Sequence, residues 1–353
     1  MSVHRRSIHP PAPSSYGGGG ALVLLILLLT TQPILSQHLR IFACAIGNDS
    51  AGAFMGGSSN GSGLYQSDDT GKTWKHLGWQ NIKCYSMNMV QSSNGRILYE
   101  ATGLGVLRST DYGEHWKQIT DWRMSEVMDV AVNQKNQEEI YLATAHGAWR
   151  TRDGGRNWQS LPVGLSEPYT DRIIIDSTKQ RHILLASENG IFALTNNSRW
   201  KHVETEQLNL QNMTVKRATA IRSIVQVSSS YWIAASENSR VLISFDSAKS
   251  FGILSYGADS LWCVAIQLIR KGDNLDFGGP FGLEHQMRDD DELMNYRDAR
   301  IPRNVSCCIR IGSPREWYEG AIAGTLGNGI YIDNGQVLDH RQIWTLKSFL
   351  VTP

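Results

Sequence analysis

The sequence predicts an all-β fold, a single β-propeller assembled from repeated units of four short antiparallel strands. An eight-residue motif containing Ser or Thr, Asp, Gly and Trp recurs at a spacing of 42 residues. Between its copies, apolar runs rich in β-branched residues alternate with short polar turns. The chain of 353 residues also contains 33 Gly, 12 Tyr and 11 Trp, which suits strands joined by many turns. Because one such unit cannot bury both of its faces, the repeats are expected to stack around an axis.

The repeated motif reads SDDTGKTW at 67–74, STDYGEHW at 109–116 and TRDGGRNW at 151–158. A degraded copy of the motif ends at Trp200. The copy SFDSAKSF at 244–251 retains Ser244 and Asp246 and has Phe251 at the position of the Trp. The Asp carboxylate is expected to accept hydrogen bonds from turn amides, and Gly can adopt positive φ without steric cost. The residues that we interpret as structural on this basis are Ser67, Asp69, Gly71, Trp74, Ser109, Asp111, Gly113, Trp116, Thr151, Asp153, Gly155, Trp158, Ser244 and Asp246.

The third copy predicts the strands of one blade most clearly. Four strands are expected at 126–133, 139–145, 148–152 and 158–161, and the motif forms the turn between the third and fourth. The other copies align with this one, and a last blade is expected to begin near Val305 and to include Trp344. Since Trp344 follows Phe251 by one repeat plus 51 residues, the spacing favours six blades. Seven is the alternative if residues 261–269 begin an additional, degraded blade.

The segment at about 267–302 breaks the 42-residue register. It contains Gly278-Gly279-Pro280, which stops regular strand pairing, and the acidic run at 289–292. We predict an inserted loop between two blades that acts as a lid or a docking loop. The acidic run lacks the alternating ligand spacing of a calcium loop, so no metal is assigned to it.

Residues 1–37 differ from the rest of the chain. A basic start and a Gly- and Pro-rich stretch precede the apolar run at 21–30, which ends close to Gln32-Pro33. This is the pattern of a signal peptide, and a short uncleaved anchor is the alternative. The propeller domain is therefore expected to comprise residues 38–353, in a protein that is secreted, periplasmic or on the cell surface.

The charge balance and the cysteines limit the classes of ligand. The 34 basic and 33 acidic residues give no field that favours nucleic acid, and membrane contact is expected only if the N-terminal segment is uncleaved. The five cysteines follow no metal-binding spacing, and we predict no metal and no cofactor. Because Cys44, Cys84 and Cys307 lie in apolar runs, we interpret the cysteines as buried thiols, and one or two disulfides are the alternative. A monomer is expected.

The motif copies resemble the Asp-box, or BNR, repeat, and the likeness covers residues 40–346. Relatives of that family include sialidases, xyloglucan-cleaving glycosidases, sortilin-type receptors and the photosystem II assembly factor. The resemblance implies a propeller but leaves the function open, because one fold hosts many sites. Arg300-Ile301-Pro302 is similar to a sialidase motif, but here it follows the repeats rather than preceding them.

The predicted ligand site lies on the rim opposite the motif turns, where the turns between second and third strands meet the links between blades. Aromatic and Arg side chains there suit a sugar or peptide surface. A run of Ala-Ser-Glu-Asn at 186–189 and 235–238 can alternatively be a tight turn. The candidate residues are Trp79, Trp122, Arg123, His146, Tyr169, Arg172, Glu188 and Glu237.

The sequence assigns no catalytic residues, because the motif carboxylates occur once per blade and are too far apart to form an acid/base pair. We predict an exported, non-catalytic propeller that binds a protein or glycan partner. The first alternative is a glycoside hydrolase of the sialidase or xyloglucanase type, which needs two carboxylates about 5–9 Å apart. The second alternative is an assembly factor for a membrane complex.

Overall fold

The structure of the protein, a computed structural model, describes residues 40–47 and 61–256 with short gaps, and the strand backbones from residue 263 onward. The gaps are at 70, 72, 94, 165–167, 180, 195–198, 206–208, 211–212, 215–219 and 238–239. The chain divides into two units, Met1–Gln37 and His38–Pro353. The predicted signal peptide or anchor and Arg300-Ile301-Pro302 lie outside the described residues. Within those residues, no helix is long and apolar enough to cross a membrane.

The described part of His38–Pro353 is all-β, a β-propeller of mainly four-stranded antiparallel sheets, as the sequence predicts. Each sheet is given from its outer to its inner strand. The first is β3 (Lys75–Leu77), β2 (Gly63–Ser67), β1 (Arg40–Gly47) and β31 (Ile343–Thr352). The second is β7 (Lys117–Gln118), β6 (Gly105–Ser109), β5 (Gly95–Thr102) and β4 (Cys84–Ser92). The third is β11 (Gln159–Leu161), β10 (Gly147–Thr151), β9 (Ile140–Thr144) and β8 (Val127–Val132). The fourth is β15 (Trp200–His202), β14 (Gly190–Leu194), β13 (Ile183–Ser187) and β12 (Thr170–Ile175).

The remaining sheets follow the same plan. The fifth is β16 (Glu204–Thr205), β22 (Ser250–Tyr256), β21 (Arg240–Ser244), β20 (Trp232–Ser236) and β19 (Ile221–Gln226), with β16 parallel to β22. The sixth is β26 (Glu292–Arg297), β25 (Gly282–Asp289), β24 (Gly272–Gly279) and β23 (Cys263–Ile269). The seventh is β30 (Gly335–Leu338), β29 (Ile330–Ile332), β28 (Ala321–Thr325) and β27 (Val305–Arg310). A two-stranded ribbon, β17 (Asn209–Leu210) and β18 (Met213–Thr214), stands apart from them.

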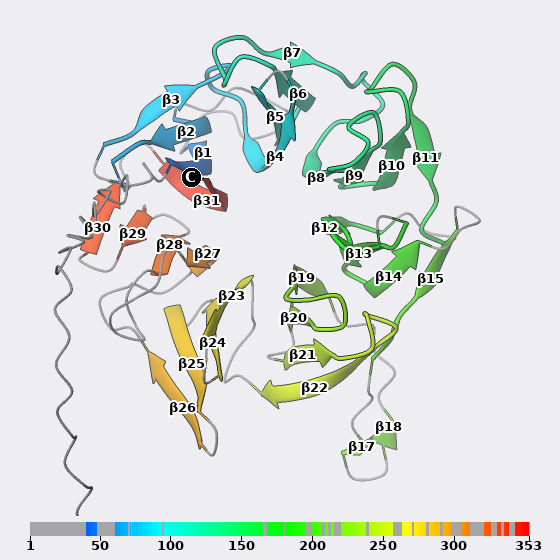
Figure 1. Cartoon of the computed structure of the whole chain (residues 1–353), viewed down its shortest axis with the longest axis vertical. Helices are drawn as coiled ribbons and strands as arrows, with labels where there is room; N and C mark the ends of the chain where they lie inside the picture. Colours follow the sequence, from blue (N-terminus) through cyan, green and yellow to red (C-terminus); the bar gives the residue numbers. More distant parts are fainter. Residues whose placement is uncertain are drawn as a thin grey trace, which may run out of the picture. The chain divides into compact units, whose positions relative to one another are not determined.

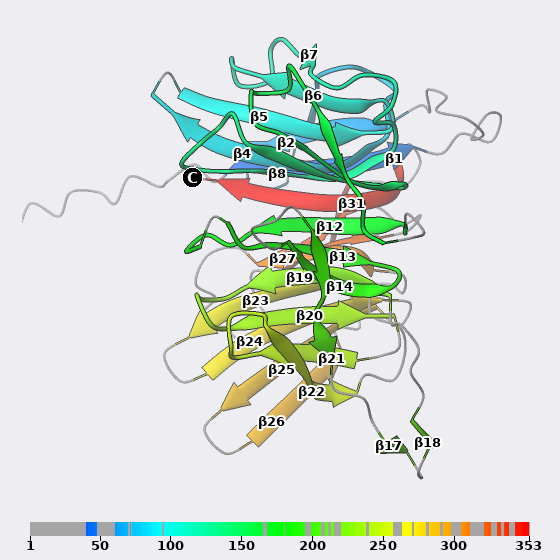
Figure 2. The ribbon, with the colours of Figure 1, turned by 90° about the vertical axis from the view of Figure 1, so that its right-hand side faces the viewer.

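The first and last parts of the domain share one sheet, which closes the ring. Ile41 of β1 pairs with Val351 of β31, and β31 is the inner strand of the first sheet (Figure 1). The inner strands then contact one another in the order β31, β4, β8, β12, β19, β23, β27 and back to β31. Figure 2 shows β8, β12 and β19 following one another when the sheets are viewed from the side. Closure of this kind leaves no exposed inner edge for pairing with another chain.

Two expectations about the C-terminal part are wrong for the described strands. The segment predicted to be an inserted loop contains β24, β25 and β26, and the two ends of its acidic run, Asp289 and Glu292, are paired residues at the ends of β25 and β26. Trp344 is in β31 of the first sheet, not in an outer strand of the last one. The 51 residues by which the spacing from Phe251 to Trp344 exceeds one repeat are therefore explained by the sixth sheet, which lacks the motif. Within the described residues, seven sheets have four or five strands.

The core lies between neighbouring sheets, and the strand period of two explains why. In β9, Ile140 and Leu142 pack with residues of the second sheet, while Tyr141 and Ala143 pack with residues of the fourth. All five residues of β9 are buried, as are those of β13 and β20. This two-sided burial accounts for the continuous apolar runs in these strands. Cys44 and Cys84, which the sequence analysis interprets as buried thiols, are free and buried where the first and second sheets meet.

The motif turns at 67–74, 109–116, 151–158 and 244–251, called the repeated turns below, share one hydrogen-bond pattern. In the second of them, the Asp111 carboxylate accepts the His115 amide at 3.0 Å and the Ser109 hydroxyl at 2.8 Å. Gly113 has a φ of 90°, and its amide donates to Ser109 Oγ at 2.8 Å. The hydrogen bonds from the His115 amide, the Ser109 hydroxyl and the His115 side chain, in that order of effect, lower the pKa of Asp111 to about 2.

The Trp indole of a repeated turn donates a hydrogen bond either within its own turn or to the preceding sheet. Trp116 Nε1 donates to Gly113 O at 2.9 Å, whereas Trp158 Nε1 donates to Ile119 O of the preceding sheet at 2.8 Å. A methyl group on Gly155 would lie 3.0 Å from the Ile119 backbone oxygen, so the turn and the preceding sheet are in close contact. The turn therefore serves packing between sheets as well as its own conformation.

Candidate functional site: the link rim

The turns between second and third strands and the links between sheets meet at one end of the sheets, as the sequence predicts. The Glu126 amide donates to Gly103 O and the Ala145 amide to Glu126 O, both at 3.1 Å. The Glu188 amide donates to Tyr169 O at 3.1 Å, and that of Glu237 to Ala220 O at 3.0 Å. This end, called the link rim, is described by residues 79–83, 103–104, 122–126, 145–146, 169–171, 188–189, 220–222 and 237.

In the second, third and fourth sheets, the turn on the link rim is held by a hydroxyl that precedes its glycine. Thr102 Oγ1 donates to Gly105 O at 2.8 Å and accepts the Leu104 amide at 3.2 Å. Thr144 and Ser187 make the same contacts in the third and fourth sheets. The run at 186–189 therefore has the geometry of the tight-turn alternative. The side chains that follow the hydroxyl are not needed by the turn and can differ from sheet to sheet.

A charged junction joins the fourth and fifth sheets on this rim. Arg222 Nη1 lies 2.6 Å from Asp171 Oδ2, and its Nε donates to Glu237 Oε1 at 2.7 Å. The guanidinium carbon is also 6.0 Å from the centre of the Tyr169 ring. Burial lowers the pKa of Arg222, but the charge of Asp171 and the bonds to both carboxylates outweigh it, so the net shift is upward. The junction is thus a fixed ion-pair network.

Two tyrosines of the rim remain protonated phenols. Burial, followed by the charge of Glu126, raises the pKa of Tyr85 to about 12. Burial and the charge of Asp171 also raise the pKa of Tyr169 above its ordinary value, and its hydroxyl lies 2.8 Å from Met128 Sδ. A tyrosine nucleophile needs a lowered pKa or an adjacent base, so the shifts at these two residues oppose that role.

The most exposed apolar side chains of the rim surround the second sheet. Trp122 is 87% exposed, Leu104 43% and Trp79 40%. Arg123, by contrast, is held in place: its Nη2 donates to Asp121 Oδ2 at 2.7 Å, and its guanidinium carbon is 5.6 Å from the centre of the Trp149 ring. A solvated indole beside a fixed guanidinium is a typical feature of binding surfaces.

The predicted residues fall into three groups. Tyr169, Glu188 and Glu237 lie together near the Arg222 junction, and Glu188 Oε1 accepts the Tyr169 amide at 3.2 Å. Trp79, Trp122 and Arg123 lie on the links around the second sheet, and His146 is exposed on the turn of the third. Arg172 does not lie on a link.

Arg172 is in the inner strand β12, beside a cavity of about 470 Å³ lined mainly by β8, β12 and β19. Its Nη1 is 3.7 Å from Asp129 Oδ1. Asp129 also accepts the Ser86 hydroxyl at 2.6 Å and the Ile173 amide at 3.0 Å, so it joins three inner strands. This network binds successive sheets together.

The sequence analysis missed Arg222 and Tyr85 as site residues. Arg222 lies within an apolar strand run, where its position gave no sign of a rim location. The pairing of Arg222 with Asp171 spans 51 residues and becomes visible only when neighbouring sheets are placed together.

One group of metal-binding residue types occurs among the described side chains, at Asp111, Glu114 and His115. His115 Nδ1 lies 2.7 Å from Asp111 Oδ2, and the same carboxylate organises the repeated turn. The conformation of the repeated turn therefore explains why Asp111, Glu114 and His115 lie close together, and we assign no metal to them.

No protein-family model matches the sequence, and no curated protein is significantly similar to it. Its fold, however, is similar to that of solved structures. The GH74 xyloglucanase from Xanthomonas campestris is 13% identical with a TM-score of 0.54, over 83% of this chain and 50% of that one. A structure named as the extracellular domain of a one component system from B. thetaiotaomicron is 16% identical with a TM-score of 0.57, over 80% and 37% of the two chains. YCF48 bound to D1 peptide is 14% identical with a TM-score of 0.51, over 83% and 87%.

These comparisons confirm the resemblance to this group of propellers at the level of the fold. The chain spans half or less of the length of the first two structures. At such low identity the likeness concerns the fold alone, because unrelated functions share one propeller architecture.

Proposed function

We propose that this protein is an exported, monomeric, non-catalytic β-propeller that binds a protein or glycan partner through the link rim. The observation that carries the proposal is the exposed indole of Trp122 beside the fixed guanidinium of Arg123. Trp79 and Leu104 extend this apolar surface around the second sheet. Aromatic and Arg side chains contribute most of the binding energy in recognition surfaces.

The chemistry of the Arg222 junction supports a binding role over hydrolysis. A glycosidase needs one carboxylate that delivers a proton and a second that attacks or activates water. Asp171 and Glu237 are both engaged by one guanidinium, an arrangement that fixes them as an ion-pair network. The raised pKa values of Tyr85 and Tyr169 likewise do not suit a tyrosinate nucleophile.

Two of the similar structures support a protein partner and an extracellular location for this protein. YCF48 is bound to a D1 peptide, so a propeller of similar fold accommodates a peptide from a protein partner. The B. thetaiotaomicron structure is an extracellular domain, which agrees with the apolar run at 21–30 as an export signal.

Site-specific photo-crosslinking in exported material tests the proposal. A benzophenone amino acid replaces Trp122 on the link rim or, as a matched control, Tyr112, which is 48% exposed on a repeated turn. We expect an adduct from position 122 and none from position 112. An adduct only from position 112 would overturn the assignment of the rim. A membrane-protein adduct would favour the assembly-factor alternative.

A second assay separates binding from hydrolysis. The protein is incubated with xyloglucan oligosaccharides and with sialyllactose, and the products are analysed by mass spectrometry. We expect both substrates to remain intact. Cleavage that is lost in Glu237→Gln would establish the glycoside hydrolase alternative instead.

A further inference from the structure

A second, chemically different pocket lies away from the link rim, between the fourth and fifth sheets. Its volume is about 540 Å³, within the range of small-molecule sites. Three segments line it: the turn between β12 and β13, the strands β14 and β15, and the repeated turn at 244–251. The eleven lining residues are Lys179, Arg181, His182, Ala193, Leu194, Lys201, His202, Val203, Ser247, Ala248 and Lys249.

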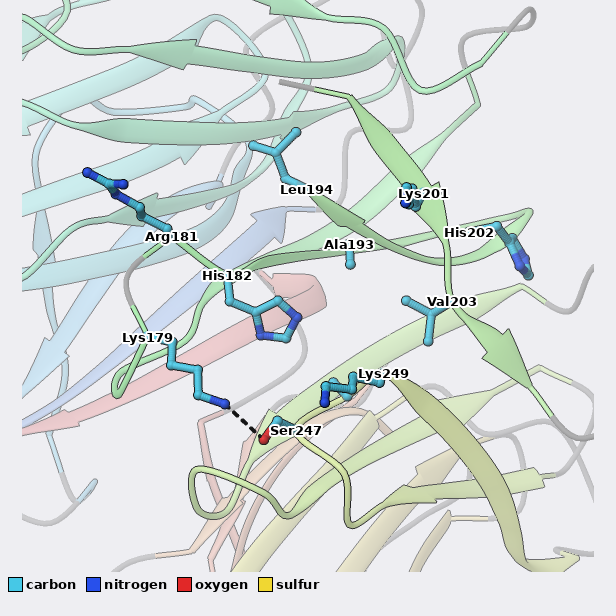
Figure 3. A pocket seen from close by; sticks show the side chains of 11 residues that line it. Lys179, Arg181, His182, Ala193, Leu194, Lys201, His202, Val203, Ser247 and Lys249 are labelled. Carbon is cyan, nitrogen blue, oxygen red and sulfur yellow. Dashed lines mark hydrogen bonds between the residues drawn. The ribbon is translucent and has the colours of Figure 1, made fainter. Parts of the chain in front are cut away.

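The ionisable side chains of this lining are all basic, and they stand around a mainly apolar surface. Four of the lining side chains are Lys or Arg, two are His, and none of the eleven is acidic. In Figure 3 the side chains of Lys179, His182 and Lys249 lie around the centre of the pocket, whereas Arg181 and His202 point outward at opposite ends. Lys179 Nζ lies 3.2 Å from Ser247 Oγ, which joins the two walls and places an ammonium and a hydroxyl side by side.

Two nearby carboxylates, Asp176 and Asp246, accept hydrogen bonds from backbone amides of the turns that line the pocket. Asp246 accepts the amides of Lys249 at 2.9 Å and Ser250 at 3.1 Å. Asp176 is fully buried and accepts the amides of Thr178 at 2.8 Å and Lys179 at 3.0 Å. Each carboxylate thus orders a turn that carries a lysine, and neither is part of the pocket lining.

Asp176 also fixes His182 at the wall of the pocket. Its Oδ2 lies 3.3 Å from His182 Nδ1, so the second ring nitrogen is the one available for a ligand. The ring also meets the indole of Trp232 edge to face, with the ring centres 6.2 Å apart. A ring held by these two contacts is positioned before a ligand arrives.

The propeller does not require cations at this place. In the third sheet, the corresponding turn is closed by Asn133 and Glu139, with Asn133 Nδ2 donating to Glu139 Oε2 at 2.9 Å. The backbone bond is the same, since Asn133 N donates to Glu139 O and Asp176 N donates to His182 O. The fourth sheet therefore has a basic residue where the third has an acidic one on an equivalent backbone.

We propose that this pocket binds a small molecule bearing a phosphate or sulfate group. The ammonium groups of Lys179 and Lys249, with His182 and the Ser247 hydroxyl, supply charge-assisted donors for the anionic oxygens. Ala193, Val203 and Ala248 supply an apolar wall for the organic part of the ligand. This site is independent of the partner surface on the link rim.

Calorimetric titration of the purified domain tests this proposal with three probes: pyrophosphate, glucose 6-phosphate and a sulfated disaccharide. Lys179→Glu with Lys249→Glu is compared with Lys117→Glu with Lys135→Glu, which changes the net charge equally at exposed sites outside the pocket. We expect saturable binding to the wild type and at least tenfold weaker binding to the pocket variant only. Glutamine at both pocket positions should give an intermediate loss, which separates lost donors from added repulsion.

The relative affinities of the sugar phosphate and the sulfated disaccharide identify which ester the pocket prefers. No saturable binding of any probe to the wild type, or equal losses in pocket and control variants, would overturn the proposal. Equal urea midpoints for all the variants show that the losses are not due to unfolding.

Discussion

The two ends of the sheets differ in what recurs from sheet to sheet, side chains together with backbone bonds at one end and backbone bonds alone at the other. On the rim of the repeated turns, both backbone and side chains recur: Asp69, Asp111, Asp153 and Asp246 accept amides of their own turns at 2.8–3.1 Å. On the link rim the backbone bonds recur, but the side chains presented by the turns change from one sheet to the next. Recurrence of side chains follows from a packing requirement that every sheet shares. A constant backbone with varied side chains is how a rigid scaffold carries a binding surface.

The largest expected effect is the loss of an aromatic anchor from a repeated turn. Trp116 packs where the first and second sheets meet, and its indole bonds Gly113 O. We expect Trp116→Ala to lower the free energy of unfolding by about 3 kcal/mol, near the lower end for a Trp because the ring is half-buried. Urea denaturation measures this. A midpoint equal to that of the wild type would show that the turn is not a packing element.

A buried carboxyl between the two rims predicts an unusual pH dependence. Glu100 Oε2 has no hydrogen-bond partner within the part of the chain that the structure describes, and burial raises the pKa of Glu100 from 4.5 to about 8. The folded protein then holds a proton that the unfolded chain has released. Stability is therefore expected to fall as the pH rises from about 4.5 to about 8, by on the order of 1 kcal/mol per pH unit.

The variant Glu100→Gln removes this proton linkage while keeping the shape of the side chain. We expect it to be more stable than the wild type at pH 7, with a flatter pH profile between pH 5 and 8. Urea midpoints across this range measure both. An unchanged slope in the variant would mean that another group carries the pH dependence.

A smaller effect is expected for a carboxylate of a repeated turn. Asp111→Ala leaves the amide of His115 and the Ser109 hydroxyl without their acceptor, but the His115 amide is exposed to solvent and the buried Ser109 oxygen still accepts the Gly113 amide. We expect a lower urea midpoint, with a shift smaller than that of Trp116→Ala, and unchanged crosslinking from position 122. Loss of crosslinking in the folded variant would show that the rim of the repeated turns takes part in binding, which contradicts the assignment to the link rim.

The smallest effect on stability is expected at Trp122, which supplies the sharpest contrast with Trp116. Because its side chain is 87% exposed, Trp122→Ala should change the free energy of unfolding by less than about 0.5 kcal/mol. Binding to the partner identified by crosslinking should nevertheless weaken. If Trp122→Ala destabilises the protein as much as Trp116→Ala does, the two rims do not divide packing from binding.

The sequence predicted the parts of the fold that contain the repeated motif. The motif predicted its own turn, and the period of about 42 residues predicted the sheets that carry it. The sixth sheet was foreseen only as an alternative, a degraded blade beginning at 261–269, because β23–β26 contain no motif. The glycines at 278–279 also suggested a break in a segment that forms β24. Trp344 was placed in the wrong sheet because closure pairs β31 with β1, a contact between the two ends of the domain.

The candidate site was predictable only in part for a similar reason. Trp79 and Trp122 could be assigned to the link rim from their positions between motif copies. The Arg222 junction could not, because its partners come from two sheets and meet only in the folded ring. The cationic pocket likewise combines residues from 179 to 249, and no short pattern in the sequence marks it.

Hydrogen–deuterium exchange of the domain with its crosslinked partner bound tests the central claim most directly. The account predicts slower exchange at 103–104, 122–126, 145–146 and 188–189, with no change at 67–74 and 109–116. Protection confined to the repeated turns, with the link rim unchanged, would contradict it.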